Sequence, residues 1–271
     1  MKISNVQTAA DGQTASADVQ VLHDLGMGRP LGGAFAGDTL WIADAHLGLT
    51  RLRKPLDAQS KVELVANSVL DPSTDQPSIL GYVNDVTVGP QSGKIYFTDS
   101  STVIPTRLPE RQSWDTMYAS KMDAFRAVPS GRLLAYDPQT DQVEILATGL
   151  RFANGISVSA DESYLVVSET FGPKIWKYYL KGDQANQAKV LVEKMMGYPD
   201  GVTCESAAAC YAVMPSSIVP LHKLVAYLPD ILDIIVRYLV LAAPRAMAPV
   251  SGDTTPTSIF PLGLLSHTPS C

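Results

Sequence analysis

The clearest structural pattern in the chain lies in residues 131–170, which read GRLLAYDPQTDQVEILATGLRFANGISVSADESYLVVSET. Apolar and polar residues alternate there in runs of only a few residues, which is the pattern of β-strands rather than of helices. The turns DPQT and SADES separate the runs, and Asp, Pro and Ser are residues that favour turns. The segment therefore predicts short strands joined by tight turns.

The same unit recurs along the chain. Each copy opens with a short polar turn that ends in Gly or Asp, and continues with an alternating strand. After another turn comes a second strand, rich in β-branched and aromatic residues. Further strand pairs lie between the copies, so that each unit has about four strands, as propeller blades do. We therefore expect an all-β propeller with about four blades present. The copies occupy residues 28–52, 82–102, 152–180 and 198–217.

The composition is that of an ordinary folded domain. The chain has 271 residues, of which 46% are hydrophobic, so it can bury a large core. Its 21 basic and 27 acidic residues leave a net charge of −6, and we expect no nucleic-acid partner because no broad basic surface is available. Residues 1–20 contain no apolar run after their single lysine, which predicts a partly ordered extension rather than a signal peptide or membrane anchor.

Two segments interrupt the repeat. Residues 103–130 are too long and too polar for a hairpin loop, so we expect an insertion over one face, with a helical stretch near 113–126. Residues 218–243 have apolar positions at helical spacing, divided by Pro229, and predict a helical insertion. This insertion either packs against the core or contacts a membrane surface or another protein. Residues 246–271 form no recognisable strand pair and predict a disordered tail.

Reactive side chains are few. Cys204 and Cys210 either form a disulfide between adjacent strand edges or remain as two buried thiols. A zinc site is not expected, because no second Cys pair and no H-x-x-x-H motif accompanies them. His46 is expected at the surface, and no His is placed as a general base, so the catalytic residues are unknown.

One position of the repeat carries oxygen ligands. Just before the first strand of each unit stand Leu31, Asn84, Asn154 and Asp200, in register with one another. In a propeller these turns point to the same end of the central channel. Amide and carboxylate oxygens that converge there suit a hard cation such as calcium or magnesium, or a polar substrate. The alternative is that they only stabilise turns, as Asn and Asp commonly do.

Four runs of the chain resemble a known protein family. The runs at residues 28–49, 83–101, 131–170 and 196–202 resemble the strictosidine synthase-like family, which includes the adipocyte plasma membrane-associated proteins. The resemblance covers about residues 21–245 and implies a six-bladed β-propeller. More distant relatives, the paraoxonases and the gluconolactonase/regucalcin group, hold calcium in the channel through Glu, Asn, Asn and Asp. The match assigns the last three roles to Asn84, Asn154 and Asp200.

The resemblance also predicts that the propeller is incomplete. Nothing in residues 1–27 resembles the turn that bears the Glu ligand, so we expect that turn upstream of Met1. The likeness ends near Arg245, which predicts an incomplete fifth blade and no sixth blade. Full-length relatives are endomembrane, vacuolar or secretory.

Three functions compete at the level of sequence. The leading hypothesis is a calcium-dependent ester or lactone hydrolase that takes a small-molecule substrate in the channel, inactive if the absent blades are essential. The first alternative is a Pictet–Spengler-type condensation of an amine with an aldehyde, which needs a carboxylate from the last blade. The second is a non-catalytic binding or scaffold propeller. The polar strand ends are expected to close blades rather than to line an active site: Asp99, Ser100, Glu169 and Thr170.

Overall fold

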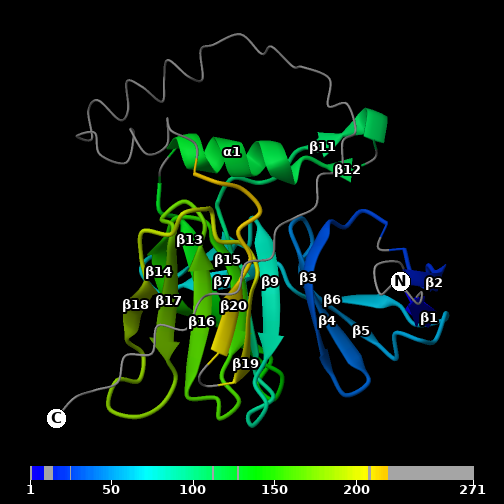
Figure 1. Ribbon diagram of the computed structural model, residues 1–271. Coiled ribbons are helices and arrows are strands. Elements are labelled where there is room, and N and C mark those ends of the chain that lie inside the picture. The colour runs from blue at the N-terminus through cyan, green and yellow to red at the C-terminus, as the bar shows by residue number, and fades with distance from the viewer. Residues whose placement is uncertain are drawn as a thin grey trace.

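The computed structural model shows an all-β chain built from stacked antiparallel sheets (Figure 1). It describes residues 2–8, 15–24, 26–111, 113–126, 128–206 and 209–218.

Three four-stranded sheets and one two-stranded hairpin form the body of the structure. The first sheet contains β3 (Pro30–Ala36), β4 (Thr39–Asp44), β5 (Gly48–Arg53) and β6 (Val62–Ala66). The second contains β9 (Val83–Val88), β10 (Ile95–Asp99), β13 (Gly131–Asp137) and β14 (Gln142–Leu150). The third contains β15 (Ala153–Val158), β16 (Tyr164–Glu169), β17 (Lys174–Tyr179) and β18 (Ala188–Val192). The hairpin consists of β19 (Val202–Ser206) and β20 (Ala209–Ala212).

Smaller elements flank these sheets. They are three strand pairs, a 3-10 turn and one helix: β1 (Lys2–Thr8) with β2 (Ala15–Gln20), β7 (Ser68–Asp71) with β8 (Gln76–Ile79), β11 (Arg107–Leu108) with β12 (Ser113–Trp114), η1 (Pro109–Arg111) and α1 (Thr116–Arg126).

The sheets are arranged as propeller blades in chain order. The first strands of successive units, β3, β9, β15 and β19, contact one another in that sequence, so they line a common axis. The four repeated units therefore correspond to three four-stranded blades and the two-stranded hairpin, and the predicted propeller fold is confirmed.

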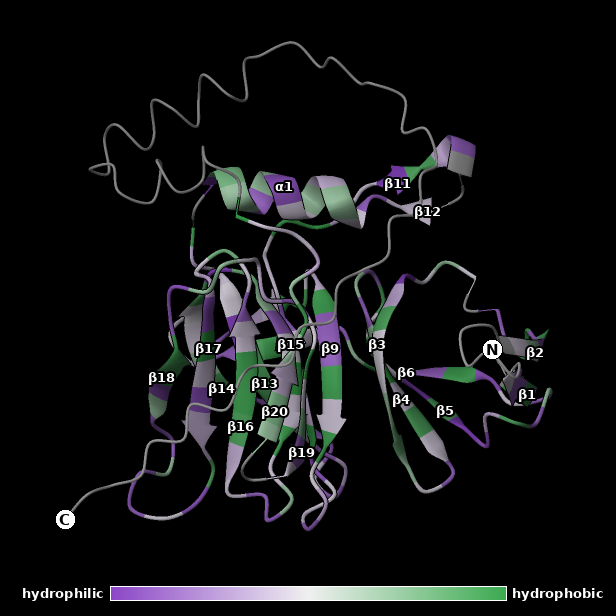
Figure 2. Ribbon diagram, viewed as in Figure 1, coloured by the Kyte–Doolittle hydropathy of each residue, from purple (hydrophilic) through white to green (hydrophobic). Residues whose placement is uncertain are grey.

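Apolar side chains pack between consecutive sheets. Figure 2 shows hydrophobic residues along the strands of these sheets. Every residue of β10 is buried, because this strand lies in the middle of a sheet that packs on both faces. Phe97 of β10 is 0% exposed, and burial of such a side chain stabilises the fold by about 1.5–3 kcal/mol. The hydrophobic runs detected in the sequence are thus the cores between blades.

The segment 103–130 covers one end of the blades, as expected for an insertion (Figure 1). Its elements β11, β12 and α1, which we call the cap, include the predicted helix, and α1 begins three residues later than predicted. Asp115 caps the helix N-terminus, since its Oδ1 accepts a hydrogen bond of 2.8 Å from the backbone N of Tyr118. Two contacts attach α1 to the second blade: the Tyr82 hydroxyl donates to the Thr116 carbonyl at 3.2 Å, and Ser101 Oγ donates to Asp123.

Two predicted segments lie outside the residues that the structure describes. The helical insertion near 218–243, with its membrane or protein contacts, and the tail 246–271 lie outside the described residues, apart from Ile218 at the border. Within the described part of the chain, no helix is long and apolar enough to cross a membrane. The alternatives for Cys204 and Cys210 are resolved, because the two residues form a disulfide.

Candidate functional site

The four residues that the sequence placed in register occupy equivalent positions in the structure. We call Leu31, Asn84, Asn154 and Asp200 the register positions. In each of the first three blades, the backbone N of the residue after the second strand donates to the carbonyl of the residue two before the register position. These hydrogen bonds are Ala45 to Arg29 (2.9 Å), Ser100 to Tyr82 (2.8 Å) and Thr170 to Phe152 (3.1 Å). Leu31, Asn84 and Asn154 are therefore copies of one site in three blades.

A hydroxyl group determines how the side chain of Asn84 is oriented. Asn84 Nδ2 donates to Ser100 Oγ at 2.9 Å, and Ser100 Oγ in turn donates to the carbonyl of Ala153 in the next blade. A hydroxyl has a single proton, so Ser100 can only accept from Asn84. The amide nitrogen therefore faces Ser100, and Oδ1 is the atom available on the other side.

The next blade repeats this pair of successive hydrogen bonds, from amide to hydroxyl to carbonyl, which we call a relay. Asn154 Nδ2 donates to Thr170 Oγ1 at 3.1 Å, and Thr170 Oγ1 donates to the Pro199 carbonyl at 2.8 Å. In both relays the hydroxyl stands 16 residues after the Asn. In both, the accepting carbonyl belongs to the residue directly before the next register position. Ser100 and Thr170 thus join neighbouring blades and orient the amides, a second role that the sequence analysis missed.

Asp200 completes the set at the hairpin. Its backbone N donates to the Val213 carbonyl at 2.8 Å, and its carbonyl accepts from Gly155 N at 3.1 Å. Burial raises the pKa of the Asp200 carboxyl, while a side-chain hydrogen bond with Asn154 acts in the opposite direction. The structure therefore brings Asn154 and Asp200 together. Among the described contacts, Asn84 is linked to this pair through Ser100 and the Ala153 carbonyl, not by a direct side-chain hydrogen bond.

Glycines next to the register positions allow the blades to converge. A Cβ on Gly32 would lie 2.8 Å from Asp85 Cα, and one on Gly155 would lie 2.4 Å from Val202 N. Both distances are too short for a side chain, so only glycine fits. These close approaches show that the innermost strands of neighbouring blades lie in direct backbone contact beside the site.

Asp85 is the exception at this glycine position, and the sequence analysis did not count it as a site residue. Its carboxylate accepts from Val86 N at 2.9 Å and from Ile156 N at 3.0 Å, so it connects the second and third blades. Burial raises the pKa of Asp85, and the nearby charge of Asp200 raises it further. The signal was an acid at a position that holds Gly in the other units.

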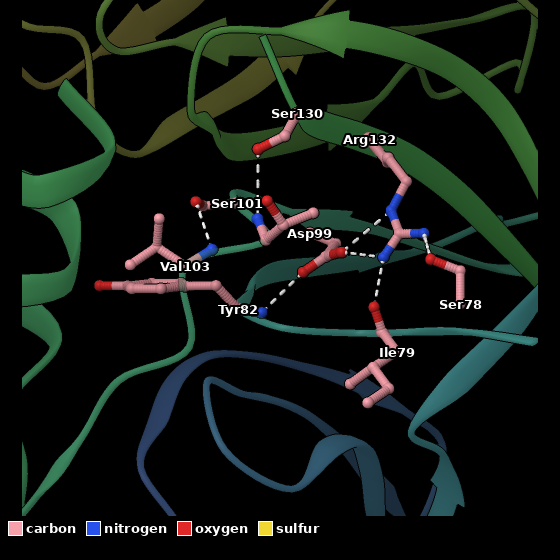
Figure 3. A network of polar contacts seen from close by, with 9 residues as sticks. Ser78, Ile79, Tyr82, Asp99, Ser101, Val103, Ser130 and Arg132 are labelled. Atoms are coloured by element: carbon pink, nitrogen blue, oxygen red, sulfur yellow. Dashed lines mark hydrogen bonds and ion pairs between the residues drawn. The ribbon is translucent and has the colours of Figure 1, made fainter. Parts of the chain in front are cut away.

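The polar strand ends Asp99 and Glu169 both bind backbone N–H groups at the blade ends. Figure 3 shows the contacts of Asp99. Arg132 donates through Nε to Asp99 Oδ2 at 3.0 Å, and Asp99 Oδ1 accepts from Tyr82 N at 2.7 Å. Burial raises the pKa of Asp99, and the Arg132 guanidinium lowers it. The same guanidinium donates to the Ile79 carbonyl at 2.6 Å, so it holds the segment that carries Tyr82.

Aromatic rings surround the mouth of the site. Tyr82, Phe152 and Tyr198 each stand two residues before a register position, and Phe171 lies between the latter two. The ring centroids of Tyr82 and Phe152 are 5.1 Å apart, those of Phe152 and Phe171 5.1 Å, and those of Phe171 and Tyr198 5.9 Å. Ala119 of α1 packs against Tyr82 and Phe152. The polar residues are therefore bordered by an apolar wall under the cap.

His46, which was expected at the surface, is partly covered by the cap. His46 is half-buried and stacks on Trp114 of the cap, with ring centroids 3.5 Å apart. Burial lowers the pKa of His46, and the charge of Arg107 adds to this effect, whereas Asp44 opposes it. The sequence could not show this contact because it comes from a distant segment.

The donor chemistry of the site fits a hard cation. Among the described residues, no group of three or more His, Cys, Asp or Glu side chains is arranged for a metal. The donors available here are instead two amide oxygens and one carboxylate, of Asn84, Asn154 and Asp200. Calcium binds such oxygen ligands. In each Asn the amide Nδ2 already donates to a hydroxyl, so Oδ1 is the atom that can bind a cation.

Known proteins share this sequence pattern. Residues 84–183 match the family model described as strictosidine synthase. The chain is related to the strictosidine synthase-like proteins. It is 33% identical to the adipocyte plasma membrane-associated protein of Gallus gallus, over 69% of this chain and 41% of that protein. It is 27% identical to the protein strictosidine synthase-like 7 of Arabidopsis thaliana, over 90% of this chain and 61% of the relative.

Solved structures agree on the fold. A gluconolactonase from Xanthomonas campestris is 18% identical with a TM-score of 0.52, covering 78% of this chain and 62% of that one. This likeness supports the propeller architecture alone. The strictosidine synthase-like chain described here spans about two fifths of the length of the adipocyte relatives that it matches.

Proposed function

We propose that this strictosidine synthase-like chain binds a calcium ion through Asn84, Asn154 and Asp200, and that the centre serves the hydrolysis of an ester or lactone. The substrate would be a small molecule in the channel. The observation that carries the proposal is the repeated relay, which orients two amides in the same way in two blades. Lactones and esters are proposed as substrates because a protein of the same fold is named a gluconolactonase.

The charge at the site favours a cation. Asp200 is the one carboxylate of the proposed set, and Asp85 adds a second negative charge nearby. Because burial raises the pKa of both carboxyls, a divalent cation relieves the cost of keeping them ionised. Calcium normally takes 6–8 oxygens, so three protein ligands predict weak binding, on the order of millimolar.

Each group would have a defined task in hydrolysis. A bound calcium ion would polarise the substrate carbonyl and stabilise the negative charge that develops on its oxygen. Asn84 and Asn154 would present Oδ1 towards the ion, held in place by Ser100 and Thr170. The aromatic wall of Tyr82 and Phe152 would hold the apolar part of the substrate, and α1 would shield it from water.

Calorimetric titration of the full chain with calcium tests the binding step. Asp200→Asn should abolish binding, because it removes the only formal charge among the three ligands. Asp183→Asn, an exposed carboxylate in a turn between β17 and β18, is the matched control and should bind as the parent does. Equal binding by Asp200→Asn would refute the assignment and leave the turn-stabilising alternative.

An aryl ester assay tests the chemistry. Turnover of phenyl acetate by the parent chain should require calcium and stop with a chelator. Binding should also weaken as the pH falls through the raised pKa of Asp200, because protonation competes with the cation. Product formed from tryptamine and an aldehyde without any metal would instead favour the condensation hypothesis. Calcium binding without either reaction would favour a non-catalytic propeller.

The proposed compartment is an oxidising one. The chain contains the disulfide Cys204–Cys210, and disulfides persist in the secretory pathway and outside the cell, whereas the cytosol keeps thiols reduced. Relatives named as plasma membrane-associated proteins agree with an endomembrane or secretory location. Thiol labelling of the protein in freshly lysed cells should leave Cys204 and Cys210 unlabelled, and labelling of both would place the chain in a reducing compartment.

A further inference from the structure

The three proposed ligands lie on different kinds of secondary structure. Asn84 and Asn154 stand on four-stranded sheets, whereas Asp200 lies two residues before the two-stranded hairpin β19–β20. Within the described residues, no third strand pairs with β19 or β20. A two-stranded hairpin by itself is marginally stable in water. The position of Asp200 therefore depends on whatever holds the hairpin together.

The disulfide lies directly across this hairpin. Cys204 and Cys210 are paired residues on the two strands and are joined by their sulfur atoms. The ladder continues from them to the pair Val202 and Ala212, and then to the hydrogen bond from Val213 N to the Gly201 carbonyl at 2.9 Å. The next bond along the ladder is the one from Asp200 N to the Val213 carbonyl. A continuous set of contacts thus leads from the disulfide to Asp200.

The residues just before the hairpin are bonded to the third blade, since Thr170 Oγ1 donates to the Pro199 carbonyl and Gly155 N donates to the Asp200 carbonyl. The hairpin itself has further contacts with that blade. Cys204 N donates to Ser157 Oγ at 3.0 Å, and Val202 and Ala212 pack against the core residues Val166 and Ile175. The first of these contacts involves the backbone of a disulfide cysteine. Separation of β19 from β20 would therefore loosen both the pairing and the attachment next to Asp200.

We propose that the Cys204–Cys210 disulfide positions Asp200, so that the chain binds calcium more strongly when this disulfide is formed than when it is reduced. This inference rests on the proposed calcium site and adds a dependence on redox state. A dithiol reductant would donate two electrons and two protons, the S–S bond would break to give two thiols, and the reductant would form its own disulfide. The cation itself takes no part in the electron transfer.

The first test compares calcium affinity in the two redox states of the full chain. Cys271→Ser serves as the background for all variants, so that the disulfide pair contains the only remaining cysteines. Titration should give at least about tenfold weaker calcium binding after reduction with dithiothreitol, and in the double variant Cys204→Ser/Cys210→Ser. Equal affinity of the oxidised and reduced chains would overturn the inference while leaving the proposed calcium site intact. No calcium binding by the oxidised chain would overturn both.

A second test distinguishes positioning from a merely structural role. Coupling between two sites is reciprocal, so calcium must favour the disulfide by the same factor by which the disulfide favours calcium. For a two-electron couple, a tenfold effect corresponds to about 30 mV. The reduction potential in dithiothreitol redox buffers should therefore become about 30 mV more negative with saturating calcium, compared with calcium-free buffer of equal ionic strength.

This measurement uses the unmutated pair, so it remains informative if the double variant fails to fold. A disulfide that only stabilised the fold, without affecting Asp200, would show the same potential with and without calcium. The same comparison in Asp200→Asn provides the control, because loss of the ligand should remove the calcium-dependent shift. Persistence of the shift in Asp200→Asn would contradict the proposal.

Discussion

The second blade and the terminal hairpin offer the same register position on very different supports. Asn84 is the second residue of β9, in a four-stranded sheet that is packed on both faces, whereas Asp200 lies two residues before a hairpin closed by a disulfide. The first support is made by burial of apolar side chains, and the second combines a smaller apolar contact with a covalent bond. The comparison indicates that one site can combine ligands that are held by packing with a ligand that is held by a cross-link.

The strongest test of this contrast removes core volume from the blade. Phe97→Ala should lower the free energy of unfolding by about 3–5 kcal/mol, because Phe97 is fully buried between two sheets. In the hairpin, Val202→Ala should cost less, since Val202 is 8% exposed and fewer methyl groups are lost. Urea unfolding followed by tryptophan fluorescence measures both.

Phe35→Ala is the matched control, because Phe35 lies on the first blade and is 67% exposed. Its effect should stay within about 0.5 kcal/mol, as for most surface substitutions. If the Phe97 and Phe35 variants were equally stable, the packing of the second blade would be wrong.

A smaller effect is expected from the hydroxyl that connects two blades. Ser100→Ala leaves the partly buried amide of Asn84 and the Ala153 carbonyl without their partner, which should cost about 1–3 kcal/mol. It should also weaken calcium binding, because the amide is free to rotate. Thermal unfolding and calcium titration measure the two effects, and Ser73→Ala, an exposed serine in a turn, should change neither. Unaltered calcium affinity in Ser100→Ala would mean that the relay does not orient a ligand.

The smallest effect concerns the cap, whose helix α1 is bonded to Tyr82 and Ser101 of the second blade. Burial raises the pKa of Asp123 in α1 to about 6, above its value in the unfolded chain. The folded state therefore holds this proton more strongly, so the stability it contributes at low pH is lost as the pH rises through about 6.

Hydrogen exchange should therefore show α1 amides better protected at pH 5 than at pH 7, after correction for the intrinsic rates, and no comparable change in β19–β20. Asp123→Asn should remove this difference. Retention of the pH dependence in that variant would assign it to another group.

The sequence predicted the part of the molecule that repeats. Four units, the offsets between them and the positions of Asn84, Asn154 and Asp200 follow from local alternation and turn chemistry, which are visible one segment at a time. The cap helix was also recognisable as an interruption of the pattern. These features depend on short-range periodicity. The structure shows the four units as consecutive sheets, and it places Asn84 and Asn154 at the second residue of β9 and β15 rather than just before these strands.

Contacts between distant segments were not predictable in the same way. The stacking of His46 on Trp114 depends on how the cap folds back over the first blade, and no local signal shows it. Asp85 could have been found, because it replaces the Gly of Gly32 and Gly155, but its bond to Ile156 N requires the neighbouring blade. The pairing of Cys204 with Cys210 needed the register of β19 and β20.

The central claim is that the packed blades and the cross-linked hairpin contribute to one cation site. Nuclear magnetic resonance of the side-chain amides during a calcium titration tests it most directly, with the amide of Asn186, which accepts from Tyr178 on the outer part of the third blade, as the control. We predict that the Asn84 and Asn154 amide resonances shift with one shared dissociation constant, that Asn186 does not shift, and that Asp200→Asn abolishes both shifts. Separate dissociation constants for Asn84 and Asn154, or unchanged shifts in Asp200→Asn, would contradict a common site.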